Sequence, residues 1–509
     1  MNTMQNSLVN LYRSHIQAGH VRVEMNGIAR EFERMFSPNR NVLTNADGYK
    51  YSQYLQYPEG TTYVASYIEA RVGAKHSRIL WCGLQAFLKE TLTVRITKKM
   101  VDKMAKIAKS AGAPFNYDGF MRIVNVFDGR WPLRIRALPE GAVVKPGTVL
   151  ALVENTHPDF FWCTSFIETM LLRAAWYMTT VATVSKDIYD LCLSTLEEFT
   201  DLKGEALEMT LKFMMNDFGA RGATCHEAAV LGGLGHLMTG FRGSDTTEAS
   251  EGAELYYNHN IEEDAPTKTV PASEHSTAAS EGEKGEHIFN SRMIKAFGDG
   301  FIFASVCDSF DHFKNVAENW LGKNRVEVDA MNARLVIRPD SGDPVDMALA
   351  TVELLDEKVG STANSKGLKV LHPKFRVIYG DGIDYDIILA IFTALIENGY
   401  SPENICFGMG GALLQKCDRD WERFAMKACE LEIMGVKRAV GKRPKTDISK
   451  ASKFGKYTPH INQDAEVVSV EEFAPTKEGL VEVFPVVYEN GHLLMDWSLD
   501  EISSFSAMQ

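Results

Sequence analysis

The sequence predicts an α/β protein with a parallel sheet, joined to a second, β-rich part. The first observation is that strand-like and helix-like segments alternate between residues 333 and 428, which is typical of βαβ units. The second is that residues 133–155 alternate β-forming residues with Pro-Glu-Gly and Lys-Pro-Gly turns, which predicts β-hairpins. A chain of 509 residues is also longer than one hydrophobic core usually organises, so we expect two or three domains.

The elements of the α/β part follow one another in order along the chain. Three predicted strands, each followed by glycine, an acid or both, lie in the stretches ARLVI, FRVIYGDG and NICFGMGG. After each comes a stretch with helical periodicity, namely VDMALATVELLDEK, YDIILAIFTALIENG and ALLQKCDRDWERFAMKA. Earlier in the chain, the apolar spacing in residues 1–40 predicts short amphipathic helices, and the acidic stretch 276–287 predicts a loop.

Charge and cysteine content exclude several classes of protein. The formal net charge of −13 argues against broad binding to nucleic acid or anionic membranes, because both need a diffuse positive field. The eight cysteines form no C-x-x-C pair, so we expect reduced thiols and no zinc site. No secretory leader and no apolar run of about 20 residues is present, and we therefore expect a soluble cytoplasmic protein without a membrane span.

Chemically similar motifs follow the three predicted strands. They are RPDSGDP at 338–344, YGDGID at 379–384 and FGMGGALLQK at 407–416. Their glycines permit tight turns and let backbone amides approach a phosphate, while their acids suit ribose hydroxyls or water on Mg²⁺. One such turn alone is about as often only a turn, but ligands bind beyond the carboxyl ends of strands in α/β folds. Three of them in succession predict one ligand-binding edge.

Other candidate residues lie outside these motifs, and each has a structural alternative. The basic stretch 435–457 suits a diphosphate clamp or a solvated loop. His275 beside Glu274 suits acid/base or nucleophilic chemistry, although a lone histidine is more often structural. Phe218 with Arg221, and Asp245 after a Gly-Ser turn, suit stacking, anion binding and hydrogen bonding; the alternatives are a core ring, a surface arginine and a turn aspartate.

Taken together, seven ordered motifs between residues 41 and 457 resemble the nicotinamide phosphoribosyltransferases, within the type II phosphoribosyltransferases that also include the nicotinate enzymes. Four of the motifs are TNADGYKYSQYLQYPEGTTYVASYIEAR, NDFGARG, GSDT and VPASEHST, and the other three are the strand-end motifs. The resemblance implies an irregular TIM-like α/β barrel over residues 181–420. It also implies a β-rich α+β domain from 41–180 with 421–509 that contributes to a dimer interface, preceded by a helical extension over 1–40.

The resemblance also implies a reaction. The ring nitrogen of nicotinamide attacks phosphoribosyl pyrophosphate, and nicotinamide mononucleotide and pyrophosphate result. It implies Mg²⁺ held largely through the substrate diphosphate, with no metal ligand named, and ATP as a co-substrate that phosphorylates His275, with Glu274 beside it. The active protein is expected to be a homodimer with shared active sites. Asp340 completes the expected catalytic set.

The base and ribose contacts implied by the resemblance are specific. Phe218 stacks on one face of nicotinamide and Tyr49 of the partner subunit on the other, with Asp47 nearby. Asp245 accepts a hydrogen bond from the carboxamide, and Asp308 lines the tunnel through which the base arrives. The remaining expected substrate contacts are Arg221, Arg338, Asp340, Gly380 and Asp381. The expected phosphate contacts are Arg71, Gly410, Gly411, Arg419, Lys427 and Lys442.

Two alternatives and a few departures from the family pattern stay open. A nicotinate phosphoribosyltransferase is the nearest alternative, although a carboxylate base facing Asp245 would meet like charge. A non-catalytic nucleotide-binding protein on the same fold is the second. Ala304, Cys307 and Met409 differ from the residues that we expect in the family. Asp343 is expected in the first turn of the next helix, where its charge favours the helix dipole.

Overall fold

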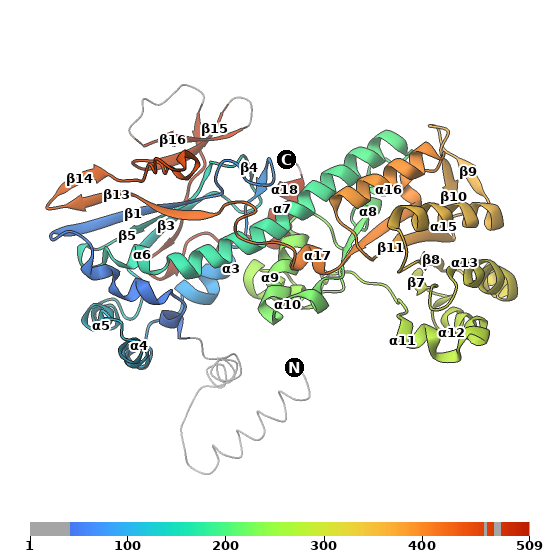
Figure 1. The fold of residues 1–509 in the computed structure, drawn as a ribbon, viewed down its shortest axis with the longest axis horizontal. Helices are drawn as coiled ribbons and strands as arrows, with labels where there is room; N and C mark the ends of the chain where they lie inside the picture. The colour runs from blue at the N-terminus through green and yellow to red at the C-terminus, as the bar shows by residue number, and fades with distance from the viewer. Residues whose placement is uncertain (1–40, 463–465, 473–479, 508) are drawn as a thin grey trace, which may run out of the picture.

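The computed structural model describes residues 41–462, 466–472, 480–507 and 509. The predicted helical extension over 1–40 lies outside the described residues. Figure 1 shows an elongated molecule with an antiparallel sheet toward one end and a parallel sheet toward the other. Among the described helices, none is both long and apolar enough to cross a membrane.

The parallel sheet has five strands, in the order β6-β12-β11-β8-β7. Every neighbouring pair in it is parallel. Its strands are β6 (Met215–Asp217), β12 (Ile405–Met409), β11 (Phe375–Tyr379), β8 (Arg334–Arg338) and β7 (Ile302–Val306). The three strands predicted between residues 333 and 411 are therefore confirmed.

Isolated bridges continue the parallel pairing from one edge strand of this sheet to the other. Asp217 of β6 bridges Ser244, Gly243 bridges Lys268, and Ala272 bridges Ala304 of β7, all in parallel. The segments that follow β6 and precede β7 in the chain thus lie beside the edge strands. The fold is mixed α/β, as predicted.

Helices pack on the outside of the parallel sheet because their apolar faces need cover. The predicted helices are confirmed as α15 (Pro344–Val359) and α16 (Tyr385–Glu397), which contact each other. Fully buried side chains from the strands and helices form one core, including Phe303, Leu335, Val377 and Phe407. Asp343 is the N-cap of α15 rather than a first-turn acid, and its carboxylate accepts from the amides at 345 and 346.

The antiparallel sheet has seven strands, in the order β14-β13-β1-β5-β3-β18-β19. The β-hairpin predicted over 133–155 is confirmed, since β3 pairs with β5 antiparallel. The sheet combines strands from both ends of the described chain: β1 (Thr61–Glu69), β3 (Leu133–Ala137), β5 (Val149–Asn155), β13 (Ala425–Ile433), β14 (Val436–Ala439), β18 (Val486–Glu489) and β19 (His492–Leu493).

Helix α7 (Glu168–Phe199) runs along both sheets and is 32 residues long. It contacts β2 and β13 on the antiparallel side and α9, α16 and α8 on the other. The domain boundary expected between residues 180 and 181 falls inside this helix. One rigid element therefore belongs to both parts of the molecule.

The remaining helices and strands fill the space between and around the two sheets. Those before α7 are η1 (Val42–Thr44), η2 (Gly48–Leu55), β2 (Ile79–Leu80), α3 (Leu84–Phe87), η3 (Leu88–Leu92), α4 (Lys98–Ser110), α5 (Tyr117–Val126), β4 (Val143–Val144), η4 (Pro158–Phe160) and α6 (Cys163–Phe166). Those between α7 and β7 are α8 (Glu205–Leu211), η5 (Ala220–Gly222), α9 (His226–Leu237), α10 (Glu248–Tyr257), α11 (His275–Ala278), η6 (Ala279–Glu281), η7 (Glu283–Gly285) and α12 (Glu286–Phe297). Those after β7 are α13 (His312–Lys314), η8 (Asn315–Lys323), α14 (Arg325–Ala330), β9 (Ser361–Ala363), β10 (Lys369–Leu371), η9 (Pro402–Asn404), α17 (Gly411–Leu414), η10 (Ile448–Lys450), β15 (Tyr457–Ile461), β16 (Val467–Glu471), β17 (Val481–Glu482) and α18 (Leu499–Ala507).

Two predictions about local structure were wrong. The helix predicted from residue 412 to 428 ends at Leu414, and β13 begins at Ala425. Between them, the carboxylate of Asp418 accepts from the amides of residues 420 and 421 and holds a turn, which competes with a helix. The loop predicted over 276–287 is instead a series of short helical turns that leads into α12.

Candidate active site

The carboxyl ends of the parallel strands bring most of the predicted site residues to one edge of the sheet. We call this edge the strand-end rim. It consists of Phe218 and Arg221 after β6, Asp245 after the bridge at 244, Glu274 and His275 after the bridge at 272, Asp308 after β7, Arg338 and Asp340 at the end of β8, Gly380 and Asp381 after β11, and Gly410 and Gly411 after β12.

His275 and Asp308 form the closest polar pair of the rim. His275 Nε2 lies 2.9 Å from Asp308 Oδ1, and His275 Nδ1 lies 3.9 Å from Asp340 Oδ2. The histidine side chain is 48% exposed and that of Asp308 only 6%, so the ring is accessible while its partner is buried. A carboxylate that accepts from Nε2 fixes the tautomer and leaves Nδ1 with a free lone pair.

Hydrogen bonds keep Asp308 ionised in spite of its burial. Burial alone would raise the pKa of Asp308, but bonds from the Ser341 hydroxyl, from His275 and from the Asp340 amide outweigh burial and lower that pKa. Both oxygens of Asp308 are thus occupied by groups of the rim. The tunnel role expected for Asp308 stays a prediction, and its contacts show instead that it orients His275.

Asp340 responds differently to the same surroundings. Burial raises the pKa of Asp340, and the nearby carboxylates of Asp308 and Asp381 add to that rise, while Arg338 and His275 oppose it. Arg338 Nε lies 3.7 Å from Asp340 Oδ1 and has no hydrogen-bond partner among the described residues. The Asp340 side chain is 28% exposed, so its carboxylate is the more accessible member of the pair.

The ring of Phe218 lies over the glycines of two neighbouring strand ends. A Cβ on Gly408 would overlap this ring, and one on Gly380 would lie 3.5 Å from it. The amide of Phe218 donates to the Met409 carbonyl at 2.9 Å, which fixes the backbone beneath the ring. Only glycine at 408 leaves room for the ring, which is half-buried and also packs against Ala304, Val336 and Ile378.

The turn after Phe218 reaches the glycines predicted to bind phosphate and the loop that carries His275. Arg221 is almost fully exposed, and its guanidinium lies 3.9 Å from the Glu274 carboxylate. A Cβ on Gly222 would lie 2.8 Å from the Gly411 Cα, so the two turns pack backbone against backbone. Arg221, Glu274 and the amides around Gly411 thus surround the same part of the rim.

Asp245 is exposed and is held by its neighbours on the rim. Its amide donates to the Asp217 carbonyl at 2.9 Å, and its carboxylate accepts from the Thr269 hydroxyl. Asp217 itself was not among the predicted site residues, although it stands in the NDFGARG motif. Its side chain is 0% exposed, and this burial of an acid next to Phe218 is visible only in three dimensions.

The predicted phosphate-binding cations belong to the other sheet. Lys427 lies on β13, Arg71 follows β1, and Lys442 follows β14. Burial lowers the pKa of Lys427, and Lys442, Arg71 and Lys50 lower it further, against the opposing charge of Glu168. We call Lys50, Arg71, Lys427 and Lys442 the cation cluster. Arg419, in the turn before β13, is half exposed beside Asp420.

Within the described residues, no hydrogen bond or ion pair joins the cation cluster to the strand-end rim. The Arg71 guanidinium donates to the Arg423 carbonyl at 2.9 Å, and Lys427 donates to the carbonyl of Met426 at 2.8 Å. The cations thus lie close to one another and to backbone carbonyls, while the acids of the rim contact His275, Arg221 and Arg338.

Tyr49 is presented outward by contacts on either side of it. Lys50 forms a buried ion pair with Glu168, while Asp47 accepts from the Thr169 hydroxyl at 2.8 Å. Both partners are in the first turn of α7. The Tyr49 side chain between them is 63% exposed, so the structure holds this ring away from its own core.

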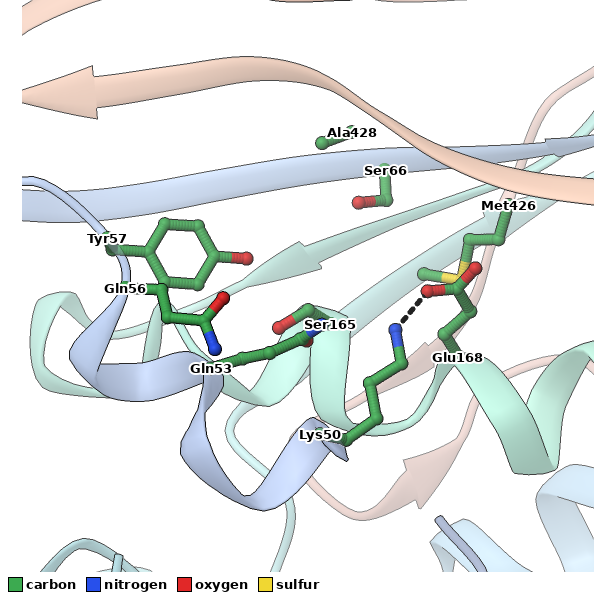
Figure 2. Close-up of a pocket in the computed structure, with 9 residues that line it drawn as sticks. All are labelled: Lys50, Gln53, Gln56, Tyr57, Ser66, Ser165, Glu168, Met426 and Ala428. Atoms are coloured by element: carbon green, nitrogen blue, oxygen red, sulfur yellow. Dashed lines mark hydrogen bonds and ion pairs between the residues drawn. The ribbon is translucent and has the colours of Figure 1, made fainter. Parts of the chain in front are cut away.

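Figure 2 shows that Lys50 reaches Glu168 along one side of a polar cavity. The cavity has a volume of about 290 Å³ and lies between η2, β1, β13 and the start of α7. Its other lining residues are Gln53, Gln56, Tyr57, Ser66, Ser165, Met426 and Ala428. Lys427 lies between the lining residues Met426 and Ala428, and no residue of the strand-end rim lines the cavity.

The acids of the rim do not form a protein cage for a metal ion. Within the described residues, no group of three or more His, Cys, Asp or Glu side chains could hold one. Mg²⁺ is usually held by one or two carboxylates together with substrate phosphates and water. Asp340 and Asp381, at neighbouring strand ends, fit that second arrangement.

Comparisons with known proteins match most of the chain. The model of the nicotinate phosphoribosyltransferase family matches residues 213–474, and the model of the nicotinamide phosphoribosyltransferase N-terminal domain matches residues 41–135. The nicotinamide phosphoribosyltransferase of Xanthomonas campestris pv. campestris is 39% identical over 91% of this chain and 97% of its own length. The nicotinamide phosphoribosyltransferase of Acinetobacter baylyi is 30% identical over 92% of this chain and 97% of its own length.

Solved structures share the fold at low sequence identity. A nicotinate-nucleotide pyrophosphorylase from Pyrococcus furiosus aligns with a TM-score of 0.56 at 14% identity, over 92% of this chain and 95% of the other. Human nicotinic acid phosphoribosyltransferase aligns with a TM-score of 0.53 at 15% identity, over 91% and 92%. At this identity the structural likeness shows the fold alone.

Proposed function

The chain belongs to the nicotinamide phosphoribosyltransferases within the nicotinate phosphoribosyltransferase family, and we propose that its strand-end rim carries out the reaction of these enzymes. The enzyme transfers the phosphoribosyl group of phosphoribosyl pyrophosphate to nicotinamide. The products are nicotinamide mononucleotide and pyrophosphate, a step of NAD salvage. The observation that carries the proposal is the ring of Phe218, which lies over Gly408 and Gly380 on a rim that also carries Asp245 and Asp340.

The reaction needs alignment more than proton transfer. The ring nitrogen of nicotinamide forms a bond to the anomeric carbon of the ribose, and the bond from that carbon to the diphosphate oxygen breaks. The electron pair leaves with pyrophosphate. Phe218 holds the base by stacking, Asp245 accepts from its carboxamide NH₂, and Asp340 accepts from the ribose hydroxyls. Such alignment removes much of the entropic barrier of a two-substrate reaction.

Charge on the leaving group is stabilised by cations. Pyrophosphate gains negative charge as the bond breaks, and Lys427, Arg71 and Lys442 suit that charge because only Glu168 opposes them. The amides at Gly410 and Gly411 suit the 5′-phosphate of the ribose. Asp340 and Asp381 would hold Mg²⁺ together with the substrate diphosphate, and the bound ion would supply further charge neutralisation.

ATP serves as a co-substrate through His275. With Nε2 bonded to Asp308, the lone pair of Nδ1 attacks the γ-phosphorus, the bond to the ADP oxygen breaks, and ADP leaves. Water later takes the phosphoryl group from the histidine. Glu274, beside His275 and 3.9 Å from Arg221, places the phosphorylated loop near an arginine that also faces substrate.

The two sets of residues are brought together by a second copy of the chain. The Tyr49 ring is exposed, and within the described part of the chain it makes no hydrogen bond or ring contact with the rim of its own subunit. In a homodimer, Tyr49 and the cation cluster of one subunit complete the rim of the other. The finer fold assignment is an irregular TIM-like barrel, formed by five strands and three bridged positions. A cytoplasmic location agrees with the eight free cysteines.

The proposal is tested by product formation. Purified protein is incubated with phosphoribosyl pyrophosphate, Mg²⁺ and either nicotinamide or nicotinate, with and without ATP, and the mononucleotide is quantified by chromatography. We expect product from nicotinamide and a higher yield with ATP. Absence of nicotinamide mononucleotide from every mixture would refute the assignment.

Selection of the base is tested by Asp245→Asn. An amide can donate to a carboxylate, so this variant should lose nicotinamide use and gain nicotinate use. Unchanged nicotinamide use without a rise in nicotinate use would contradict the role of Asp245.

A further inference from the structure

Asp217 is a fully buried acid directly beneath the base site. It is the last residue of β6 and precedes Phe218, and its side chain is 0% exposed. Its Oδ1 accepts from the Gly219 amide at 2.7 Å. Its Oδ2 lies beside the Thr246 hydroxyl, and within the described residues neither atom makes a close hydrogen bond. A buried carboxylate oxygen with so weak a partner costs free energy, so packing alone does not explain this acid.

The backbone of Asp217 joins the two residues that recognise the base. Its carbonyl accepts from the Asp245 amide at 2.9 Å, and its amide donates to the Gly243 carbonyl at 3.1 Å. On the other side, Phe218 donates to the carbonyl of Met409. The side-chain bond to Gly219 then closes the turn that carries the Phe218 ring. One residue thus fixes the stacking ring and the carboxamide acceptor relative to each other.

The surrounding helices leave room for the carboxyl group. A Cβ on Gly233 of α9 would lie 2.7 Å from the Ala249 Cβ and 3.5 Å from Asp217 Oδ2. The glycine thus lets α9 and α10 approach each other beside the acid. Among the described residues, the ionisable groups that act most strongly on this carboxyl are the acids Asp245 and Glu248, and Tyr177 of α7 also lies near it.

We propose that Asp217 is a positioning residue for base recognition, which holds the Phe218 turn against Asp245 and places a second carboxyl group behind it. This inference rests on the proposed function, because it assumes that the base binds between Phe218 and Asp245.

The ionisation of Asp217 makes the proposal measurable. Burial raises the pKa of Asp217 to about 6, Asp245 and Glu248 add to the rise, and the Gly219 amide and the Thr246 hydroxyl oppose it. Asp217 is therefore neutral below that pH and negative above it. A negative charge behind Asp245 repels the anion nicotinate and leaves neutral nicotinamide nearly unaffected. Preference for nicotinamide over nicotinate should thus rise as pH passes through 6.

The experiment compares wild type with Asp217→Asn and Asp217→Leu. Asparagine keeps an acceptor for the Gly219 amide and cannot ionise, whereas leucine removes the acceptor. We measure KM and kcat for nicotinamide, and the inhibition constant of nicotinate, from pH 5.5 to pH 8 without ATP. In wild type, nicotinate should bind about tenfold more weakly at high pH than at low pH. In Asp217→Asn the pH dependence of nicotinate binding should disappear, and KM for nicotinamide should stay within about twofold of wild type. In Asp217→Leu, KM for nicotinamide should rise about tenfold with a smaller fall in kcat.

Controls separate this proposal from the proposed function and from misfolding. Thermal unfolding of each variant shows whether it is folded, and Glu248→Gln removes a nearby charge that lies outside the turn. An Asp217→Asn enzyme with the same pH dependence of nicotinate inhibition as wild type would overturn the inference. An inactive wild type would instead refute the proposed function. The role of Asp217 would then be tested by calorimetry, which measures the binding of nicotinamide to wild type and to each variant.

Discussion

The strand-end rim and the cation cluster are opposite in charge and in the way they are held. The acids of the rim accept hydrogen bonds from fixed partners, as Asp308 does from His275 and Ser341. The cations of the cluster lie close to like charges, and Lys427 has its pKa lowered by burial and by three neighbours. The acids of the rim thus have hydrogen-bond partners within their own chain, while the four cations of the cluster share the carboxylate of Glu168.

This difference shows how a chain can keep acids and cations for one reaction from neutralising each other. Direct ion pairs between rim and cluster would occupy the groups that the substrate needs. By carrying them on two sheets, the molecule keeps both groups free of each other, as the proposed roles of the cations at the diphosphate and of the acids at the ribose and base require. The predictions below test whether the two regions meet only through a second subunit.

The largest expected effect concerns Tyr49 and Asp245. Tyr49→Ala and Asp245→Ala should each lower activity more than about a hundredfold, because each removes one side of the base site. If the sites are shared, mixed subunits form heterodimers with one intact site of two, and random mixing restores about a quarter of wild-type activity. Activity is measured after the two variants are unfolded and refolded together.

The control for this experiment is refolding of each variant alone. Heterodimers that regain no activity, although they form, would show that one chain builds the whole site and that the two regions meet within it.

Loss of a cluster cation should have the next largest effect. Lys427→Ala should raise KM for phosphoribosyl pyrophosphate about thirtyfold, because removal of a partner from a partly buried charge pair costs about 2 kcal/mol. KM for nicotinamide should change little. Lys437→Ala is the matched control, since Lys437 lies on the adjoining strand but faces Glu430 at 3.9 Å. Equal effects of the two variants would mean that the cluster acts only through overall charge.

Within the rim, Ser341→Ala should weaken ATP stimulation about tenfold, because a hydrogen bond to a charged group contributes about 1.5 kcal/mol. The Ser341 bond helps to lower the pKa of Asp308, so its loss raises that pKa. Asp308 then becomes protonated at higher pH, and the low-pH limb of ATP hydrolysis should move upward in pH. Ser309→Ala is the control, since its buried hydroxyl has no partner among the described residues. If the low-pH limb of ATP hydrolysis stayed at the same pH in Ser341→Ala, ionisation of Asp308 would not determine its position.

The smallest expected effect concerns the support of Tyr49. Lys50→Met should raise KM for nicotinamide about threefold with little change in kcat, because the exposed ring would lose part of its fixed position. Lys89→Met breaks a comparable ion pair, with Asp496, away from both regions and should have no effect. If wild type, Lys50→Met and Lys89→Met had a similar KM for nicotinamide, the ion pair of Lys50 with the first turn of α7 would not position Tyr49.

The sequence predicted the parallel sheet and the rim well because both follow from local patterns. Apolar runs that end in glycine and acid mark strand ends, and parallel strands bring such ends together. The helix predicted after Gly411 was wrong because apolar spacing continued through 412–428, while Asp418 closed a turn and β13 paired with β1. The pairing of β13 with β1 thus determined the structure of this segment more strongly than its helical spacing of apolar residues.

Other features could not be predicted from local patterns. In sequence, Asp217 resembles the other acids at strand ends, and only its complete burial distinguishes it. The grouping of Arg71 with Lys427 joins residues far apart in the chain and depends on the register of β1 and β13. The roles expected for these residues, and for the rest of the site, stay predictions until the variants are measured.

Because helix α7 supports residues of two sites, a mutation in it should have a dominant effect. Its first turn holds Tyr49 through Lys50 and Asp47, and about 14 Å along the same helix the Tyr177 hydroxyl bonds the carbonyls of Leu414 and Ala228, behind the phosphate loop. In the proposed dimer these two points serve different catalytic centres. A mutation that bends α7 would therefore damage both catalytic centres of a heterodimer. Mixing such chains with Tyr49→Ala or Asp245→Ala chains should restore no activity. Expressed beside a normal copy, such an allele would leave only about a quarter of dimers unharmed and behave as dominant.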